Sequence, residues 1–263
     1  MAATVGTVGP LRDRRGLAAA AGVLAVFAAS LSACGGDSVH VTRDITYGAH
    51  GGTPLTLDVY SPSGHKTGAG TADLLPAIVV IHGGAWTQGD KRDVSESARG
   101  FAEAKFVAVA INYSIPPPGQ RFPAELDDSQ AAVRWVQQHA QDLGIDPNRV
   151  GVEGSSAGGN LAMMIGVIGT GDASMPRVKA VASWSGVSDL SVLVSSDGKS
   201  HADHPPVGCG TSTTCIGVAT PAVFTDYLGC TLARCPTRYR NASPISFVSP
   251  QSPPMYLAAF HDD

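Results

Sequence analysis

A serine flanked by glycines, with a β-branched run before it and small residues after it, is the part of the sequence best suited to chemistry. Val150–Glu153 leads into Gly154-Ser155-Ser156-Ala157-Gly158. A strand, a sharp turn and a helix in this order form a nucleophile elbow, which exposes the serine hydroxyl and needs glycines where helix and strand approach each other. Ser156 is therefore the candidate nucleophile. An ordinary strand-to-helix turn gives the same pattern, so the neighbouring elements decide between the two interpretations.

Exposed backbone amides are expected after a second buried strand. The continuous apolar run Pro76–His82 predicts a strand covered on both faces, and a glycine pair follows it. Open α/β sheets bind ligands at this carboxyl edge. A carbonyl attacked by Ser156 would become an oxyanion, which preorganised amides stabilise. The amides expected to do so belong to Gly83, Gly84 and Ala157, whereas His82 is expected to orient the loop rather than act as a base.

Strands and helices alternate along the chain, which predicts an α/β fold. The alternating stretches 39–47 and 55–60 predict an antiparallel hairpin at the start. Further strands are expected at 76–82, 106–112, 150–154, 178–184 and 255–260, and helices at 94–105, at 125–143 and directly after Ser156. The sequence therefore predicts a mostly parallel mixed sheet with helices on both faces.

Length and composition favour one enzyme-sized domain over a disordered or nucleic-acid-binding chain. The 263 residues are 43% apolar and carry a net charge of -4. A chain of this size can bury a sizeable core. No basic patch stands out, so nucleic acid is not an expected partner. The chemistry of a serine nucleophile requires no cofactor.

The first 34 residues read as an export signal. Arg12, Arg14 and Arg15 precede the apolar run Leu17–Leu31, which is too short to span a membrane. The sequence Leu-Ser-Ala-Cys ending at Cys34 resembles the lipobox of bacterial lipoproteins, which implies lipid attachment at that cysteine. The expected organisation is a signal peptide over 1–33, a tether over 34–44 and a hydrolase domain over 45–263. A soluble secreted protein remains the alternative, and a twin-arginine signal fits poorly.

Four further cysteines fall in a segment without an apolar period, about 187–240. An exported protein meets an oxidising compartment, which favours disulfides. Three connectivities exist for four cysteines, and the local pairs Cys209–Cys215 and Cys230–Cys235 are favoured. The histidines His201 and His204 match no zinc spacing, so no metal is expected. The segment is either a substrate-shaping cap over the active edge or an ordinary disulfide-stapled excursion.

The motifs together resemble the α/β-hydrolase family, and within it the esterases and lipases similar to hormone-sensitive lipase and to the BD-FAE (feruloyl esterase-like) group. His82–Trp86, with Gly89–Lys91 just after it, resembles the oxyanion loop of that group, and residues 146–162 resemble its elbow. Phe122–Asp128 resembles the helix before the elbow, and Ala242–Ile245 the approach to the next strand. The resemblance spans about residue 45 to the end, apart from the insertion, and implies an ester or lipid substrate.

The resemblance also implies a triad in the chain order serine, acid, histidine. The acid is expected a few residues beyond the strand at 255–260, at Asp262 or Asp263, with Asp263 favoured. Beyond Ser156 the histidines are His201, His204 and His261, and each is poorly placed to act as the base. The sequence therefore predicts an incomplete product that lacks the last strand and helix of the fold.

These observations predict a serine carboxylic-ester hydrolase, an esterase or lipase, lipid-anchored to the outer face of the bacterial cell membrane. Two alternatives use the same scaffold. One is a non-catalytic or degenerate cell-envelope lipoprotein. The other is an amidase or peptidase with the same elbow.

Overall fold

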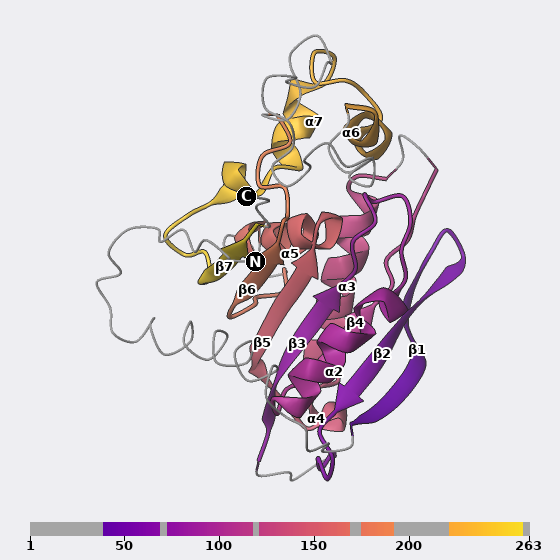
Figure 1. Cartoon of the computed structure of the whole chain (residues 1–263), viewed down its shortest axis with the longest axis vertical. Coiled ribbons are helices and arrows are strands. Elements are labelled where there is room, and N and C mark those ends of the chain that lie inside the picture. The colour runs from indigo at the N-terminus through magenta and orange to yellow at the C-terminus, as the bar shows by residue number, and fades with distance from the viewer. Residues whose placement is uncertain (1–38, 69–72, 118–120, 169–174, 192–220, 260–263) are drawn as a thin grey trace.

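Seven strands form one mixed sheet in the computed structural model, which describes residues 39–68, 73–117, 121–168, 175–191 and 221–259 (Figure 1). The spatial order is β1-β2-β4-β3-β5-β6-β7. The hairpin β1-β2 and the pair β2-β4 are antiparallel, and the other neighbours are parallel. The expected mixed sheet is confirmed. The strands are β1 (His40–His50), β2 (Thr53–Ser61), β3 (Leu75–Ile81), β4 (Val107–Ile111), β5 (Ile145–Ser155), β6 (Val181–Trp184) and β7 (Met255–Ala258).

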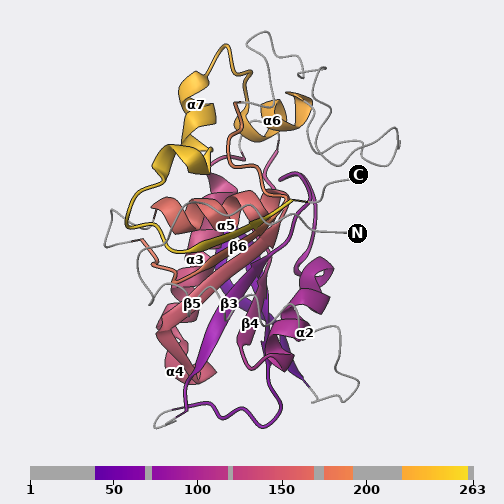
Figure 2. The same cartoon turned by 60° about the vertical axis from the view of Figure 1, so that its left-hand side comes forward.

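Helices cover both faces of this sheet (Figure 2). On one face, α2 (Ser95–Glu103) buries Ala98, Phe101 and Ala102 against alternate residues of β3 and β4. On the other face, α3 (Ala124–Gln138) and α5 (Ala157–Ile168) enclose the larger core. The central strands are buried on both sides, which explains why their sequences are continuous apolar runs.

Two elements differ from their expected bounds for local reasons. The helix expected over 125–143 breaks at His139, whose ring nitrogen Nδ1 lies 2.9 Å from the Trp135 carbonyl, and a short helix α4 (Ala140–Leu143) follows. Strand β5 begins five residues before the expected strand. Leu75 pairs with Ile145 and Ala77 with Val150, so the intervening turn residues bulge out of the ladder.

Two helices lie beyond the carboxyl ends of the strands, where the sequence shows no apolar period (Figure 1). They are α6 (Pro221–Leu228) and α7 (Pro236–Asn241), and a 3₁₀ turn η3 (Pro244–Phe247) leads from them to β7. Phe224, Tyr227 and Leu228 of α6 are 0% exposed and belong to the main core. This part of the segment expected over 187–240 is therefore packed onto the domain.

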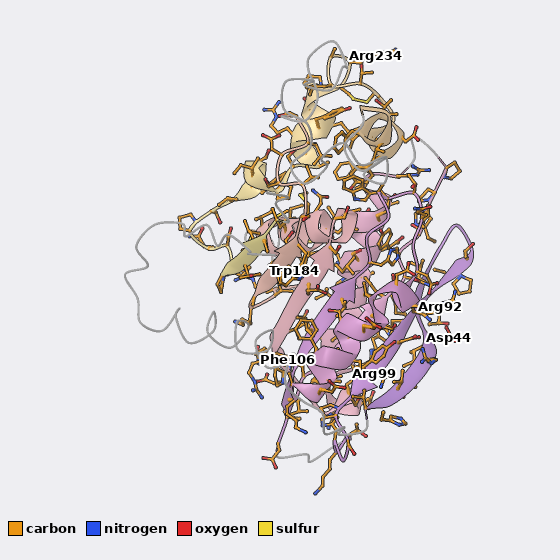
Figure 3. The ribbon with its side chains drawn as sticks, in the orientation of Figure 1. Asp44, Arg92, Arg99, Phe106, Trp184 and Arg234 are labelled. Carbon is orange, nitrogen blue, oxygen red and sulfur yellow. A yellow bond between two sulfur atoms is a disulfide. The ribbon has the colours of Figure 1, made fainter. Side chains whose placement is uncertain are left out.

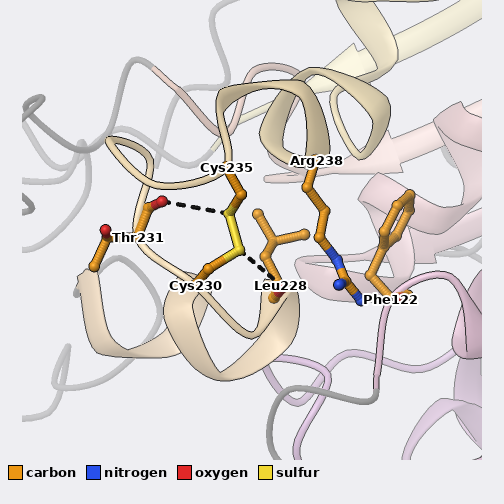
Figure 4. The surroundings of a disulfide bond; sticks show 6 residues. All are labelled: Phe122, Leu228, Cys230, Thr231, Cys235 and Arg238. Atoms are coloured by element: carbon orange, nitrogen blue, oxygen red, sulfur yellow. Dashed lines mark hydrogen bonds between the residues drawn. A yellow bond between two sulfur atoms is a disulfide. The ribbon is translucent and has the colours of Figure 1, made fainter.

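A disulfide joins the segments that follow α6 and precede α7. Cys230 and Cys235 are bonded with 6.2 Å between their Cα atoms (Figure 4), which is one of the two local pairs favoured from sequence. Beside it, Arg238 donates a hydrogen bond to the Phe122 carbonyl, and the Phe122 N–H donates to the Tyr227 carbonyl at 3.1 Å. These contacts fasten α6 and α7 to the start of α3.

The expected export signal and lipid site cannot be placed, because residues 1–38, with Cys34, lie outside the described residues. Among the helices that are described, none combines the length and the apolar character needed to cross a membrane.

Candidate active site

Ser156 occupies the turn between β5 and α5, as the elbow pattern predicts. Its φ is +54°, in the left-handed region that residues other than glycine rarely adopt. The Ser156 N–H donates to the Trp184 carbonyl at 2.8 Å, and the Ser156 carbonyl accepts from the Asn160 N–H at 3.0 Å. Strain of this kind costs about 1–3 kcal/mol and persists only when the surrounding structure enforces it.

The two glycines of the motif are required by close backbone approach. A Cβ atom on Gly154 would lie 2.3 Å from the Gly158 carbonyl oxygen. A Cβ atom on Gly158 would lie 2.2 Å from the Ile81 carbonyl oxygen and 2.5 Å from that of His82. Helix α5 therefore begins in contact with the end of β3, which brings the elbow to the loop that follows β3.

That loop lies directly against Ser156. A Cβ atom on Gly83 would stand 3.4 Å from the Ser156 Cβ and 3.0 Å from the Ser155 carbonyl oxygen. Gly84 has a φ of +116°, and a Cβ atom there would lie 2.0 Å from the Gln88 carbonyl oxygen. Ala157 is the first residue of α5, where backbone N–H groups have no partner within the helix. The structure thus brings the nucleophile candidate and the three expected oxyanion donors to one place.

His82 stabilises the loop that carries Gly83 and Gly84. It is 1% exposed, its Nδ1 donates to the Gly83 carbonyl at 2.7 Å, and its ring stacks on Tyr113 with 4.2 Å between centroids. The Tyr113 hydroxyl in turn donates to the His82 carbonyl at 3.2 Å. Burial holds the pKa of His82 below its usual value, despite the hydrogen bond to Gly83, so the ring is neutral at pH 7. These contacts agree with a role in orienting the loop.

The far end of the loop is held by an ion-pair cluster. Lys91 is 4% exposed, and its Nζ lies 2.7 Å from Asp44 Oδ1 and 2.8 Å from Asp58 Oδ1. Asp90 accepts hydrogen bonds from Arg92 Nε at 2.6 Å and from Asn112 Nδ2 at 3.2 Å. The cluster therefore ties the loop to the hairpin β1-β2 and to the end of β4.

A charged cavity of about 640 Å³ opens over this cluster. Asp44, Arg92 and Arg99 line it on the β1-β2 side of the sheet. Trp184, at the end of β6 beside the elbow strand, lies away from these three residues (Figure 3). Three of the cavity's cations are paired: Arg43 and Lys91 with Asp58, Lys91 also with Asp44, and Arg92 with Asp90. The cavity lies beside the candidate site and does not contain Ser156.

Helix α6 covers the aromatic end of the loop. Trp86 is 1% exposed and stacks on Tyr227 with 4.1 Å between ring centroids and 9° between planes. Phe224 lies 6.2 Å from Trp86, and Phe122 lies 5.7 Å from Tyr227, centroid to centroid. We call α6 the cap helix, because it packs on the loop that carries Gly83 and Gly84. This part of the segment therefore packs on the candidate oxyanion loop.

Glu153 is a buried acid three residues before Ser156. It is 4% exposed, and its Oε2 accepts a hydrogen bond from the Ser97 hydroxyl at 3.5 Å. Burial raises the pKa of Glu153 to about 7, and the hydrogen bonds from Ser97 and Trp184 lower it less. Glu153 lies on the α2 side of β5, so its proton affects the stability of the strand that carries the elbow.

Glu153→Gln is expected to make stability fall less steeply than in wild type as the pH rises from 4.5 to 7. As the pH rises through that window, the unfolded chain loses the Glu153 proton before the folded chain does. Glu153 therefore lowers the free energy of unfolding by about 1.4 kcal/mol per pH unit, about 3 kcal/mol in total. The variant lacks this contribution and keeps the fall that other buried acids produce. Urea unfolding at several pH values measures it, with the exposed Glu103→Gln as control. An equal fall in wild type and Glu153→Gln would contradict the assignment.

Several residues expected at the site lie outside the described residues. They are the acid candidates Asp262 and Asp263, the histidines His201, His204 and His261, and the cysteines Cys209 and Cys215. Within the described ranges, no group of three or more His, Cys, Asp or Glu side chains is arranged to hold a metal ion.

Sequence reasoning missed three residues that hold the site together. Tyr113 stacks on the His82 ring, as described above. Asp128 of α3 accepts hydrogen bonds from the N–H and hydroxyl of Ser114, which fixes the loop after β4. Asn160 Nδ2 donates to the Val187 carbonyl at 2.8 Å, which holds the segment after β6. A polar residue inside an otherwise apolar helix face was the one available signal for Asn160.

The BD-FAE family model matches residues 57–263. Among curated proteins, carboxylesterase NlhH of Mycobacterium tuberculosis is 38% identical over 121 residues, which cover 46% of this chain and 36% of that protein. The probable carboxylic ester hydrolase LipM of the same organism is 28% identical over 229 residues, which cover 84% of this chain and 47% of that protein. The alignments thus span less than half the length of these relatives.

Solved structures share the fold at low sequence identity. A truncated form of a carbohydrate esterase from gut microbiota aligns with a TM-score of 0.62 at 22% identity, over 85% of this chain and 78% of that chain. A thermophilic esterase from Thermogutta terrifontis aligns with a TM-score of 0.59 at 24% identity, over 83% of this chain and 69% of that chain. At these identities the likeness establishes the architecture alone.

Proposed function

The chain belongs to the BD-FAE family, and on that basis we propose that it is a carboxylic-ester hydrolase of the α/β-hydrolase fold with Ser156 as nucleophile. The observation that carries the proposal is the position of Ser156. It sits at a φ of +54° on the strand-to-helix turn, with Gly83 packed against its Cβ atom. A strained serine beside a glycine-rich loop is the arrangement that acyl transfer needs.

In the proposed reaction, Ser156 Oγ forms a bond to the acyl carbon while its proton passes to a base. The carbonyl oxygen takes up the electron pair, and the amides of Gly83, Gly84 and Ala157 stabilise that charge. Collapse expels the alcohol, which receives the proton, and water then hydrolyses the acyl-serine by the same route. Removing one oxyanion donor typically costs about 3 kcal/mol of transition-state stabilisation.

The proposal assigns the base to a histidine outside the described residues. His82 is not suited to it, because its Nδ1 proton is donated to the Gly83 carbonyl and its ring is buried under Tyr113. The orienting acid is proposed at Asp263, with Asp262 as the alternative. Reading the nucleotides after codon 263 tests this assignment: an in-frame or frameshifted histidine loop supports the enzyme, and its absence favours the non-catalytic alternative.

The proposed substrate is a small acyl ester or lipid, whose carbonyl would be placed beside Ser156 and the amides of Gly83, Gly84 and Ala157. The protein expressed from its full reading frame is expected to hydrolyse p-nitrophenyl acetate and butyrate, and to cleave the matching p-nitroanilides far more slowly. Initial rates with paired substrates of equal acyl length measure this preference. Faster cleavage of the amides would instead assign the protein to the amidase or peptidase alternative.

We propose further that the protein is exported and anchored by a lipid on Cys34. The proposal rests on the basic, apolar and small-residue sequence over 1–34. Wild-type protein expressed in a bacterium is expected to incorporate radiolabelled palmitate and to sediment with membranes, whereas Cys34→Ala does neither. Equal labelling of both proteins would refute the anchor.

A further inference from the structure

A buried acid lies three residues after Phe122, where the cap helix is attached to the start of α3. Glu125, in the first turn of α3, is 0% exposed, and neither carboxyl oxygen accepts a hydrogen bond from another described residue. Burying an ionised carboxyl without a partner is strongly unfavourable. An acid at this position of a helix ordinarily favours the helix dipole from the surface. Its complete burial calls for another explanation.

The charge of Glu125 affects the pKa of two tyrosines, Tyr113 after β4 and Tyr227 of α6. Burial raises the pKa of Tyr113 and of Tyr227, and the charge of Glu125 raises each further. Tyr113 carries the His82 ring and bonds its carbonyl, while Tyr227 stacks on Trp86. The charge of Glu125 therefore acts on two aromatic residues that pack on the loop, one through His82 and one through Trp86.

Three other buried polar atoms, on Trp86, on its stacking partner Tyr227 and on Arg121, also lack partners among the described residues. They are Tyr227 Oη, Trp86 Nε1 and Arg121 Nη1. A neutral carboxylic acid both donates and accepts hydrogen bonds, whereas a carboxylate only accepts. The neutral form is therefore the one that fits a pocket of hydroxyl and ring groups without a counter-charge bonded to it.

Burial is also the main electrostatic influence on Glu125 and raises its pKa to about 8. The positive charge of Arg121 lowers this pKa, and the negative charge of Asp128 raises it. The other titratable and charged groups that act on Glu125 or on its neighbours are Arg121 before α3, Asp127 and Asp128 of α3, Tyr113 and His82 at the sheet edge, His50 of β1, Tyr227 of α6 and Arg238 of α7.

We propose that Glu125 is a positioning residue: while its buried carboxyl is neutral, the cap helix stays packed against the loop carrying Gly83 and Gly84, and this packing weakens as the pH rises. Its link to catalysis rests on the proposed function, whereas the docking of α6 does not. The cap helix is fastened beside Glu125 through the Phe122 N–H bond to the Tyr227 carbonyl at 3.1 Å, so a charge at Glu125 acts where α6 is attached.

Hydrogen–deuterium exchange of the α6 peptide tests the proposal in the Ser156→Ala protein, which needs no turnover. When α6 opens, Glu125 meets water and its pKa returns toward 4.5, so opening becomes about tenfold easier per pH unit up to about pH 8. After correction for intrinsic rates, wild-type α6 protection is expected to fall at least 100-fold between pH 5.5 and 8.5. Glu125→Gln is expected to change less than threefold.

The matched control is Glu153→Gln, which removes a second buried acid on the opposite face of the sheet and should keep the wild-type fall in α6 protection. An equal fall in Glu125→Gln and wild type, or no fall in wild type, would overturn the proposal. If Glu125→Gln does not fold, Arg121→Gln carries the test. Loss of that positive charge should move the end of the fall to higher pH, and an unmoved end contradicts the proposal.

Because exchange reports docking alone, its outcome is separate from that of the ester assay. Loss of the α6 response with intact ester hydrolysis rejects the role of Glu125 and leaves Ser156 in place. The expected fall in α6 protection without ester hydrolysis supports the role of Glu125 and rejects Ser156 as the nucleophile.

Discussion

Ser156→Ala is expected to lower kcat/KM for a short acyl ester by about 10⁴-fold or more, because the variant lacks the hydroxyl proposed to attack the acyl carbon. The substitution removes one oxygen from a half-buried side chain. The free energy of unfolding is therefore expected to change by less than about 1 kcal/mol. Initial rates with p-nitrophenyl butyrate, together with urea unfolding of the same preparations, measure both effects.

The matched control is Ser155→Ala, one residue earlier and exposed on the end of β5. Its exposed side chain is not on the strand-to-helix turn itself, so kcat/KM should stay within about threefold of wild type. Retention of activity in Ser156→Ala would refute the nucleophile assignment, and so would a comparable loss in Ser155→Ala.

Gly158→Ala is expected to destabilise the protein by about 3 kcal/mol or more and to abolish ester hydrolysis. Glycine to alanine inside a helix normally stabilises by up to about 1 kcal/mol. Here the added Cβ atom would lie 2.2 Å from the Ile81 carbonyl oxygen and 2.5 Å from the His82 carbonyl oxygen, both backbone atoms. The backbone must move apart, which separates Ser156 from its oxyanion donors.

Gly100→Ala on α2 is the control, because a Cβ atom there meets nothing within 4 Å. It should leave activity unchanged and raise the free energy of unfolding slightly. Urea unfolding followed by circular dichroism compares the two variants. Equal effects on stability would show that Gly158 is not sterically required, and the close packing of α5 against β3 would then be wrong.

The parallel core of the fold was predictable because its strands and helices carry strong local patterns. The run 76–82 is buried on both faces, and the 125–138 helix has a clear apolar period. The cap helix was not predictable in the same way. Phe224, Tyr227 and Leu228 are buried within eight residues flanked by cysteines and glycine, too short a stretch for a period to appear. Its packing partners, Trp86 and Phe122, are distant in sequence.

The chemistry-bearing part of the site was predictable from backbone constraints. Gly83, Gly154 and Gly158 stand where a Cβ atom would crowd the turn, so the spacing of glycines reports contacts directly. The supporting residues leave no such trace. Tyr113 and Glu125 act through burial between elements, and a single acid in a first helical turn looks like ordinary dipole stabilisation.

The most direct measurement is the site of covalent modification by paraoxon, an organophosphate that reacts with activated serines. The protein expressed from its full reading frame, treated until esterase activity is lost, is digested and its peptides are sequenced by mass spectrometry. A single diethylphosphoryl group on Ser156, absent from the Ser156→Ala protein, is the predicted result. Loss of activity with the group on any other residue, or with Ser156 unmodified, would contradict the assignment of Ser156 as the nucleophile.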